Sequence, residues 1–522
     1  MIKNFKWLFL VSLTFIACNN DDETVVNNTS DGLPLTSGSA NFSKYVALGD
    51  SFAAGFSDGA LFIEGQKGAY PNILAQQFAL AGGGAFTTPF MADNVGGFLG
   101  STIYTPRLYL APPTTPGGSP TPSSVALPPY NQTSSTTFAS LGSTYNNMGI
   151  PGAKSFHLLA PGYGSAAGNP YFARFATNAG TTVIADAIAQ SPTFFSLWIG
   201  GNDELGYATA GGDASVNPLT PPATFESSYN TLVTQLTAGG RKGVIANLPY
   251  VTTLPYFYVI KHNQLTQANL TVGGVNQVNN LNTQLYGPLK NALTFLGEGN
   301  RINLLSTTGN NPMLMVDENL TDLTTPLAQV ITQGLILQGV PAAQASAQGA
   351  LFGQVFGRAR QTLPTDLICL SASSRIGQTP TVAADGIASP TPTLGQLGIT
   401  FPLPDRYVLL PSEVAEIKTA TDSYNAVIQN AATTNNLAFV DAKAIMDQLV
   451  TTAGISANGF TVTSTYVTGG AFSLDGVHPS PRGYALIANK FLEAINAKYG
   501  SNFKNVDLGK YRILFPPNPA NF

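Results

Sequence analysis

Five short runs of apolar residues predict buried β-strands. They cover residues 45–48, 145–150, 194–199, 244–248 and 437–440. Near-continuous apolar runs suit parallel strands in a sheet that is covered on both faces, because a strand with one face in water alternates apolar and polar residues. The pattern therefore predicts a mostly five-stranded parallel sheet inside the protein.

Amphipathic helices are predicted between these runs. One helix follows Ser412, its expected N-cap, and repeats apolar residues with a period of 3.6 at Val414, Ile417, Ala420, Tyr424, Val427 and Ile428. Residues 224–236 form a second helix that ends before Gly239, and residues 482–499 form a third. Strands that alternate with helices in this way favour a doubly wound α/β domain.

Two long stretches interrupt the alternation of strands and helices. Residues 82–140 are rich in Gly, Pro, Ser and Thr, and residues 304–403 form a second insertion. Loops of this length in a compact domain are usually functional, which suggests a lid or a wall over a substrate cleft. A packed subdomain with its own core is the alternative, and the helical spacing within residues 326–357 favours it there.

The composition excludes several classes of function. Among 522 residues, 24 Lys and Arg stand against 28 Asp and Glu, which gives a net charge of −4 and argues against a nucleic-acid partner. Two cysteines, Cys18 and Cys369, are too few for a disulfide scaffold or a Cys-ligated zinc site. The acidic residues 317–322 lack the glycine and the spacing of a calcium loop, so no metal site is predicted.

The first forty residues are interpreted as an export signal and a tether. Lys3 and Lys6 precede the apolar stretch 7–17, which is too short to span a membrane but has the length of a signal-peptide core. Residues 15–18 (FIAC) resemble a bacterial lipobox, in which the cysteine, here Cys18, becomes the lipidated first residue; an ordinary secretory signal is the alternative. Residues 18–40 read as a flexible tether.

The tether begins with an acidic run that bears on location. Residues 21–23 (DDE) look like the acidic export signals of some Bacteroidota lipoproteins, although a solvated linker has the same composition. No other stretch reaches eighteen apolar residues, so the lipid on Cys18 would be the only membrane anchor. The expected location is the cell envelope, at the outer membrane, on either its periplasmic face or the cell surface.

Four local motifs at the ends of predicted strands could carry chemistry. Ser51 follows the first strand in Gly49-Asp50-Ser51, where backbone N–H groups at the start of a turn favour a developing negative charge. Gly152 follows the second strand, and without a side chain its N–H group can approach a bound oxygen. Asn202 follows the third strand and offers amide donors for an oxyanion hole.

The fourth motif contains a candidate general base. The chain has only three histidines, and His478 lies three residues after Asp475 in one loop. A carboxylate at this spacing can reach one ring nitrogen, fix the tautomer and stabilise the imidazolium. His157 and His262 have no such neighbours and are interpreted as structural, and Cys369 is expected to be a small buried side chain.

The order of these motifs resembles that of the GDSL, or SGNH, hydrolase family. Its blocks match at residues 49–51, Gly152, 200–203 and 475–478, and residues 247–249 (NLP) resemble the turn after its fourth strand. The motif has Phe52 where the family name implies Leu, and the two insertions depart from the family pattern. The resemblance implies a flavodoxin-like, three-layer α/β/α fold over residues 41–522, as a single domain with both insertions.

The resemblance also implies the roles of the site residues. Ser51 would be the nucleophile, His478 the base and Asp475 its orienting partner. The oxyanion hole would use the N–H groups of Ser51 and Gly152 and the side chain of Asn202, and no cofactor or metal is needed.

Three functions are compatible with these motifs. A lipase or carboxylesterase is favoured, a polysaccharide O-deacetylase could use the same site, and a non-catalytic surface binding lipoprotein is the alternative outside enzymes. Aromatic residues of the first insertion (Phe86, Phe90, Phe98, Tyr104 and Tyr109) would either line an apolar acyl surface or belong to the core. The sequence leaves open the acyl chain length, the alcohol half of the substrate and the oligomeric state.

Overall fold

The computed structural model describes residues 34–113, 120–125, 133–136, 141–142, 144–165 and 167–520. The predicted signal peptide, the lipidated Cys18 and most of the tether lie outside the described residues. Within the described part of the chain, no helix is long and apolar enough to cross a membrane.

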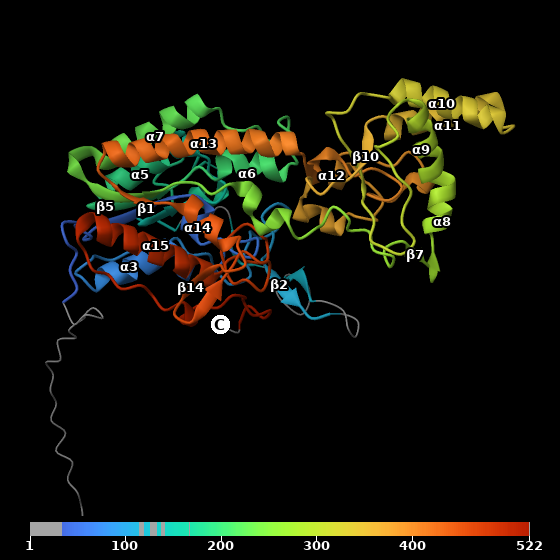
Figure 1. Cartoon of the computed structure of the whole chain (residues 1–522). Helices are drawn as coiled ribbons and strands as arrows, with labels where there is room; N and C mark the ends of the chain where they lie inside the picture. Colours follow the sequence, from blue (N-terminus) through green and yellow to red (C-terminus); the bar gives the residue numbers. More distant parts are fainter. Residues whose placement is uncertain are drawn as a thin grey trace, which may run out of the picture.

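A parallel sheet of five strands forms the centre of the molecule (Figure 1). The strand order is β13-β6-β5-β1-β4, and all four pairings are parallel. The strands are β1 Tyr45–Gly49, β4 Asn147–Gly149, β5 Phe194–Trp198, β6 Lys242–Ala246 and β13 Ala438–Val440. The prediction of a five-stranded parallel sheet is confirmed, because each strand falls on one of the five apolar runs.

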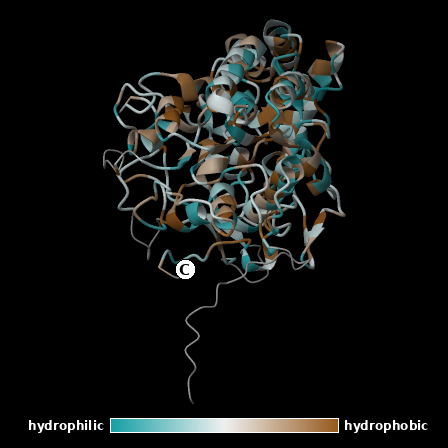
Figure 2. Cartoon of the chain, turned by 90° about the vertical axis from the view of Figure 1, so that its left-hand side faces the viewer, coloured by the Kyte–Doolittle hydropathy of each residue, from teal (hydrophilic) through white to brown (hydrophobic). Residues whose placement is uncertain are grey.

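Helices cover both faces of this sheet and make three layers. On one face lie α5 Val183–Ala189, α6 Asn202–Thr209, α7 Pro222–Thr237 and α13 Pro411–Thr434. On the other lie α3 Tyr70–Ala79, α14 Ala442–Leu449 and α15 Pro481–Tyr499, which Figure 1 shows below the sheet. The helices change between apolar and polar residues along their length (Figure 2), as expected for elements with one buried face.

The helix starts follow from proline and from local capping. Helices α7, α13 and α15 all have proline in the first turn, where its missing N–H group costs nothing. The N-cap of α13 is Leu410, so the expectation that Ser412 caps this helix is wrong: Pro411 starts the helix, and Glu413 accepts a hydrogen bond from the Leu410 N–H. Ser480 caps α15 by accepting from the Gly483 N–H.

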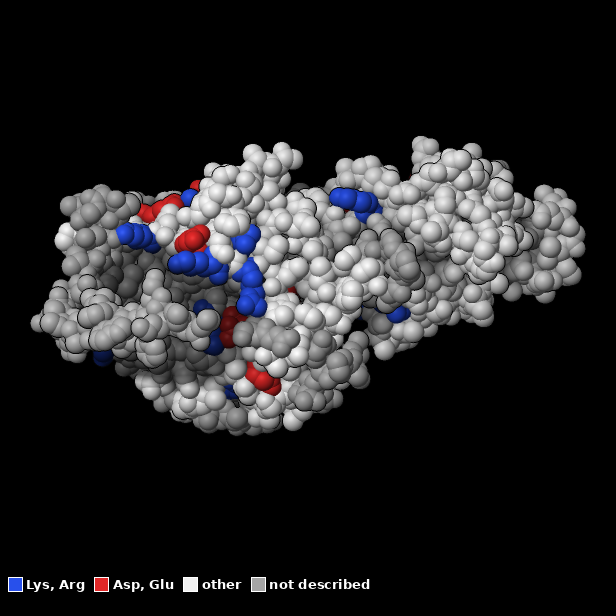
Figure 3. All heavy atoms as spheres, turned by 90° about the horizontal axis from the view of Figure 1, so that it is seen from below, with Lys and Arg blue, Asp and Glu red and all other residues white. Residues whose placement is uncertain are grey.

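A second hydrophobic core lies beside the sheet, built from residues between Ile260 and Leu410. We call this part of the chain the inserted unit; Figure 1 shows it at the right. Its helices are α8 Val278–Leu281, α9 Gly287–Phe295, α10 Thr324–Leu337, α11 Ala342–Phe356 and α12 Val382–Asp385. On the face shown in Figure 3, charged side chains are sparse, and most lie over the part that contains the sheet.

Short elements complete the fold. The remaining helices are α1 Ser51–Ala54, α2 Ile63–Lys67 and α4 Pro170–Ala173. The two-stranded pairs are β2 Leu108–Ala111 with β3 Thr121–Ser124, β7 Thr271–Val272 with β8 Val275–Asn276, β9 Leu314–Val316 with β10 Ala359–Gln361, β11 Leu367–Ile368 with β12 Val408–Leu409, and β14 Ile455–Ala457 with β15 Phe460–Val462.

The inserted unit depends on a buried ion pair network around Arg360. Its Nε donates to Asp317 at 2.5 Å, and its two terminal nitrogens donate to Asp366 at 2.6 and 2.9 Å. Replacing this side chain leaves two buried carboxylates without their cation. We expect Arg360→Met to lower the free energy of unfolding by about 3–5 kcal/mol, as measured by guanidinium denaturation.

The neighbouring Arg358 provides the control for this prediction. Its guanidinium is 45% exposed and lies 3.6 Å from Asp322. Arg358→Met should cost about 1 kcal/mol or less, because exposed ion pairs contribute little. Equal costs for the two variants would contradict the structural role of the buried network.

Candidate active site

The candidate nucleophile lies directly after the first strand of the sheet. β1 ends at Gly49, and Ser51 is the first residue of the short helix α1. The Asp50 carboxylate accepts a hydrogen bond from the Phe52 N–H at 2.9 Å, and this cap fixes the turn that carries Ser51. Ser51 is 6% exposed, so its hydroxyl is presented from a largely buried position.

The structure brings Ser51, His478 and Asp475 into one hydrogen-bonded chain. His478 Nε2 lies 2.8 Å from Ser51 Oγ, and His478 Nδ1 lies 2.9 Å from Asp475 Oδ2. Asp475 Oδ1 also accepts from the backbone N–H groups of Val477 and His478. The arrangement gives the imidazole a fixed tautomer, with Nε2 free to accept the hydroxyl proton.

The charge of Asp475 is maintained despite its burial. Burial alone would raise the pKa of Asp475, but the charge of His478 and the hydrogen bonds from His478 and Val477 outweigh it and hold this pKa below the usual range. The carboxylate therefore stays ionised near neutral pH. It can then stabilise a positive charge on the imidazole during proton transfer.

The residues expected to form an oxyanion hole lie on the two neighbouring strand ends. Gly152 follows β4 with a φ of +80°, a conformation that favours glycine. Asn202 starts α6 after β5, and its Nδ2 donates to the Ala153 carbonyl at 3.0 Å, which leaves its second amide hydrogen available. Within the described residues, the N–H groups of Ser51 and Gly152 donate to no backbone carbonyl.

Residues 344–491 match the family model described as GDSL-like Lipase/Acylhydrolase. The matched segment contains Asp475 and His478, whereas Ser51, Gly152 and Asn202 precede it. No curated protein and no solved structure shows significant similarity to the chain. The five-stranded parallel sheet between two helical layers is consistent with the SGNH-hydrolase fold of this family, so the predicted fold class is confirmed.

Other predicted residues support the loops of the site or lie away from it. Asp203 accepts hydrogen bonds from the N–H and the hydroxyl of Ser155, which ties the loop after β5 to the loop after β4. His157 Nδ1 accepts from the Lys154 N–H, and burial lowers the pKa of this histidine. Cys369 is fully buried, and burial raises the pKa of its thiol far above the usual range.

A supporting loop that the sequence did not reveal holds the Asp-His loop. The Gly59 N–H donates to Asp475 Oδ2 at 2.8 Å, and the Ser473 hydroxyl donates to Asp475 Oδ1 at 3.1 Å. Asp58 connects the two loops, because its N–H donates to Ser473 Oγ and its Oδ1 accepts from the Leu474 N–H. The only sequence signal was the Asp-Gly turn at residues 58–59, which is common in proteins without any active site.

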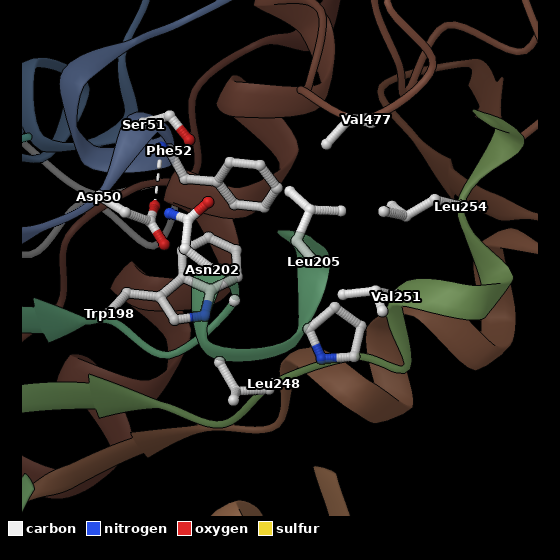
Figure 4. Close-up of a pocket in the computed structure, with 12 residues that line it drawn as sticks. Asp50, Ser51, Phe52, Trp198, Asn202, Leu205, Leu248, Val251, Leu254 and Val477 are labelled. Atoms are coloured by element: carbon white, nitrogen blue, oxygen red, sulfur yellow. Dashed lines mark hydrogen bonds between the residues drawn. The ribbon is translucent and has the colours of Figure 1, made fainter. Parts of the chain in front are cut away.

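An apolar pocket opens beside Ser51 (Figure 4). The Phe52 ring extends into it from the turn of the nucleophile, and Asn202 points toward that turn. The apolar wall comes from the loops after β5 and β6 and from the histidine loop: Trp198, Leu205, Leu248, Pro249, Val251, Leu254 and Val477. The aromatic residues expected from the first insertion do not line this pocket; Phe86 stacks on Tyr45, and Phe98 packs against Tyr171.

One group of carboxylates away from the triad could hold a cation. Among the described residues, Glu318, Asp405 and Glu413 place oxygens within 4.8 Å of one another. Burial, together with the neighbouring carboxylates, raises the pKa of Asp405 to about 8 and that of Glu413 to about 9. These two groups are therefore largely protonated near neutral pH, a state in which they compete poorly for a metal ion.

The burial of Asp58 predicts how stability depends on pH. Burial and the nearby charge of Asp475 raise the pKa of Asp58 to about 7, although the Leu474 N–H and Arg107 oppose the shift. Because the folded state then holds this proton more tightly than the unfolded chain does, the stabilisation from protonation is present at pH 4 and is lost by pH 8. Asp58→Asn removes this titration and keeps an oxygen for the Leu474 N–H. Relative to wild type, we expect its free energy of unfolding to rise by up to about 4 kcal/mol between pH 4 and pH 8.

Urea unfolding at the two pH values measures this difference. Glu226→Gln, a matched change at an exposed position of α7, should give the same difference from wild type at both values. An Asp58→Asn variant whose difference from wild type does not change with pH would contradict the assignment.

Proposed function

We propose that the protein is a serine ester hydrolase, a lipase or carboxylesterase that acts through an acyl-Ser51 intermediate. The proposal rests on one observation, the hydrogen-bonded chain from Ser51 through His478 to Asp475 beside the N–H groups of Ser51 and Gly152. The family match at residues 344–491 supports an acylhydrolase. An ester of a lipid or of an acylated carbohydrate is the substrate class.

Acylation follows from the geometry of the three residues. Ser51 Oγ attacks the ester carbonyl carbon while its proton moves to His478 Nε2, and the carbonyl oxygen becomes an oxyanion. The N–H groups of Ser51 and Gly152 and the amide of Asn202 donate to that oxyanion; one such donor typically contributes about 2.7–4 kcal/mol to the barrier. The carbon–oxygen bond to the alcohol then breaks, and His478 returns its proton to the departing oxygen.

Deacylation reverses these roles with water. His478 takes a proton from water as the oxygen attacks the acyl carbon, the bond to Ser51 Oγ breaks, and His478 protonates Ser51 again. Asp475 remains ionised throughout and stabilises the imidazolium in both halves of the reaction. Because the base must be neutral, activity should rise with pH through the range in which histidine loses its proton.

The apolar pocket favours a lipase or carboxylesterase over a deacetylase. An acetyl group offers a single methyl, whereas the pocket beside Ser51 is walled by several leucine, valine and aromatic side chains. Such a wall gains affinity in proportion to the apolar area that the acyl group buries.

The test is hydrolysis of p-nitrophenyl esters, from acetate to palmitate, by the chain without residues 1–18. Ser51→Ala should lose at least about three orders of magnitude in kcat, because the nucleophile is removed while binding remains. Ser423→Ala, a matched change at an exposed position of α13, should leave kcat unchanged. Equal turnover by wild type and Ser51→Ala, or a pH profile that is flat from pH 5 to 8, would contradict the mechanism.

We also propose that a lipid on Cys18 anchors the protein in the cell envelope, at the outer membrane. The lipobox-like residues 15–18 and the tether that follows support this location. Metabolic labelling with an alkyne fatty acid should mark the full chain and should not mark Cys18→Ser. Labelling of both forms would contradict modification at this cysteine.

A further inference from the structure

A second apolar cavity lies inward of the catalytic pocket. Its walls come from β13, α14, α15 and the loops beside them, and every lining residue is uncharged: Phe52, Trp198, Pro249, Leu254, Val440, Ala442, Ile445, Met446, Leu449, Phe472, Pro479, Ile487 and Phe491. The cavity volume is about 50 Å³, next to about 40 Å³ in the catalytic pocket.

Four residues belong to the walls of both cavities, namely Phe52, Trp198, Pro249 and Leu254. The Phe52 ring packs edge-on against Trp198 at a centroid distance of 5.1 Å and against the His478 ring at 5.6 Å. Phe52 therefore separates the reacting groups from the inner cavity, and the shared apolar wall continues past it (Figure 4).

The chemistry of the inner cavity restricts what can fill it. Water in a buried site needs two to four polar partners, and this wall of hydrocarbon, aromatic and thioether groups offers almost none. An empty apolar cavity also costs stability in proportion to its volume. An alkyl chain satisfies both constraints, and Met446 on α14 is a flexible side chain that can adapt to it.

We infer that the inner cavity is the acyl-chain site, and that the enzyme selects esters of medium-chain fatty acids. The inference rests on the proposed function, because it requires the acyl group to be attached to Ser51. Each water-sized group needs roughly 10–15 Å³ of cavity. The two volumes together therefore hold an acyl chain of about six to nine carbon atoms. The chain runs from Ser51 across the Phe52 ring toward Ile445 and Met446.

The acyl half of the ester has the stronger claim on this cavity than the alcohol half. The acyl group stays bound to Ser51 while water attacks, so a pocket continuous with the nucleophile holds it through two chemical steps. The alcohol leaves after the first step and needs a path to solvent. A closed apolar cavity would retain an alkyl alcohol and slow its release.

The first test is the chain-length profile of kcat/KM. With p-nitrophenyl esters, hexanoate and octanoate should exceed acetate and palmitate by at least about tenfold, since each buried methylene raises affinity about fourfold. Ile445→Trp places a large ring in the inner cavity from a partly exposed position. It should lower the octanoate value at least about tenfold and leave the acetate value within about twofold.

Two further variants control for effects on folding. Val450→Trp introduces the same ring at the end of α14, at an exposed position that lines neither cavity, and should not change the profile. Met446→Phe fills the cavity with a smaller increase in size, so it should shift the optimum by a few carbons if Ile445→Trp folds poorly. An unchanged profile in a folded cavity-filling variant would overturn the inference while leaving the esterase proposal intact.

The alcohol half provides a second comparison. Acetate esters of ethanol, butanol and hexanol should differ little in kcat/KM. A strong preference for the long alcohol, with none for a long acyl chain, would assign the cavity to the other half of the ester and overturn the inference.

Binding of octanoate tests the cavity without any turnover. Calorimetric titration of Ser51→Ala should detect octanoate but not acetate, and Ile445→Trp in the same background should weaken octanoate binding at least about tenfold. If folded Ser51→Ala does not bind octanoate, the inference fails whether or not the wild type hydrolyses esters. If octanoate binds but wild type hydrolyses no ester, the proposed function fails and the cavity assignment to an alkyl chain stands.

Discussion

The register of β1 between its two neighbours sets the geometry of the site. Gly49 at the end of β1 pairs with Gly149 of β4 on one side and with Trp198 of β5 on the other. Because the strands are parallel and end at the same level, the three following loops leave the sheet together. Ser51, Gly152 and Asn202 then share one small region although about 150 residues separate the first from the last. A shift of one strand by a single residue would reverse its side chains and separate these groups.

The histidine loop reaches this region from the far end of the chain, and several contacts hold it there. The Ser57 hydroxyl donates to the Pro479 carbonyl at 3.1 Å, and the Tyr484 hydroxyl donates to the Phe56 carbonyl at 2.7 Å. Both contacts flank the hydrogen bonds that Asp475 accepts from the same loop. The segment 56–59 is therefore a brace between nucleophile and base. Its rigidity limits the distance over which the Ser51 proton must move.

The sheet and the site motifs could be predicted because their signals are local. A buried strand is a short apolar run, and the groups at its end follow within a few residues, as Ser51 does after β1. The brace around Asp58 and the inner cavity could not be predicted, because each combines side chains from segments hundreds of residues apart. The cap of α13 was misassigned because serine usually favours N-caps, whereas the proline before it already starts the helix.

The position of the inserted unit has a consequence for the order in which the chain folds. It separates two strands that pair directly, since β6 ends at Ala246 and β13 begins at Ala438. Closing so long a loop by chance is entropically costly and slow. The inserted unit has its own hydrophobic core, and its early collapse would bring the two flanking segments together before they pair. This part of the chain then acts as a folding scaffold for the edge of the sheet, and the inner cavity, which needs β13 and α14, is completed only after that edge has formed.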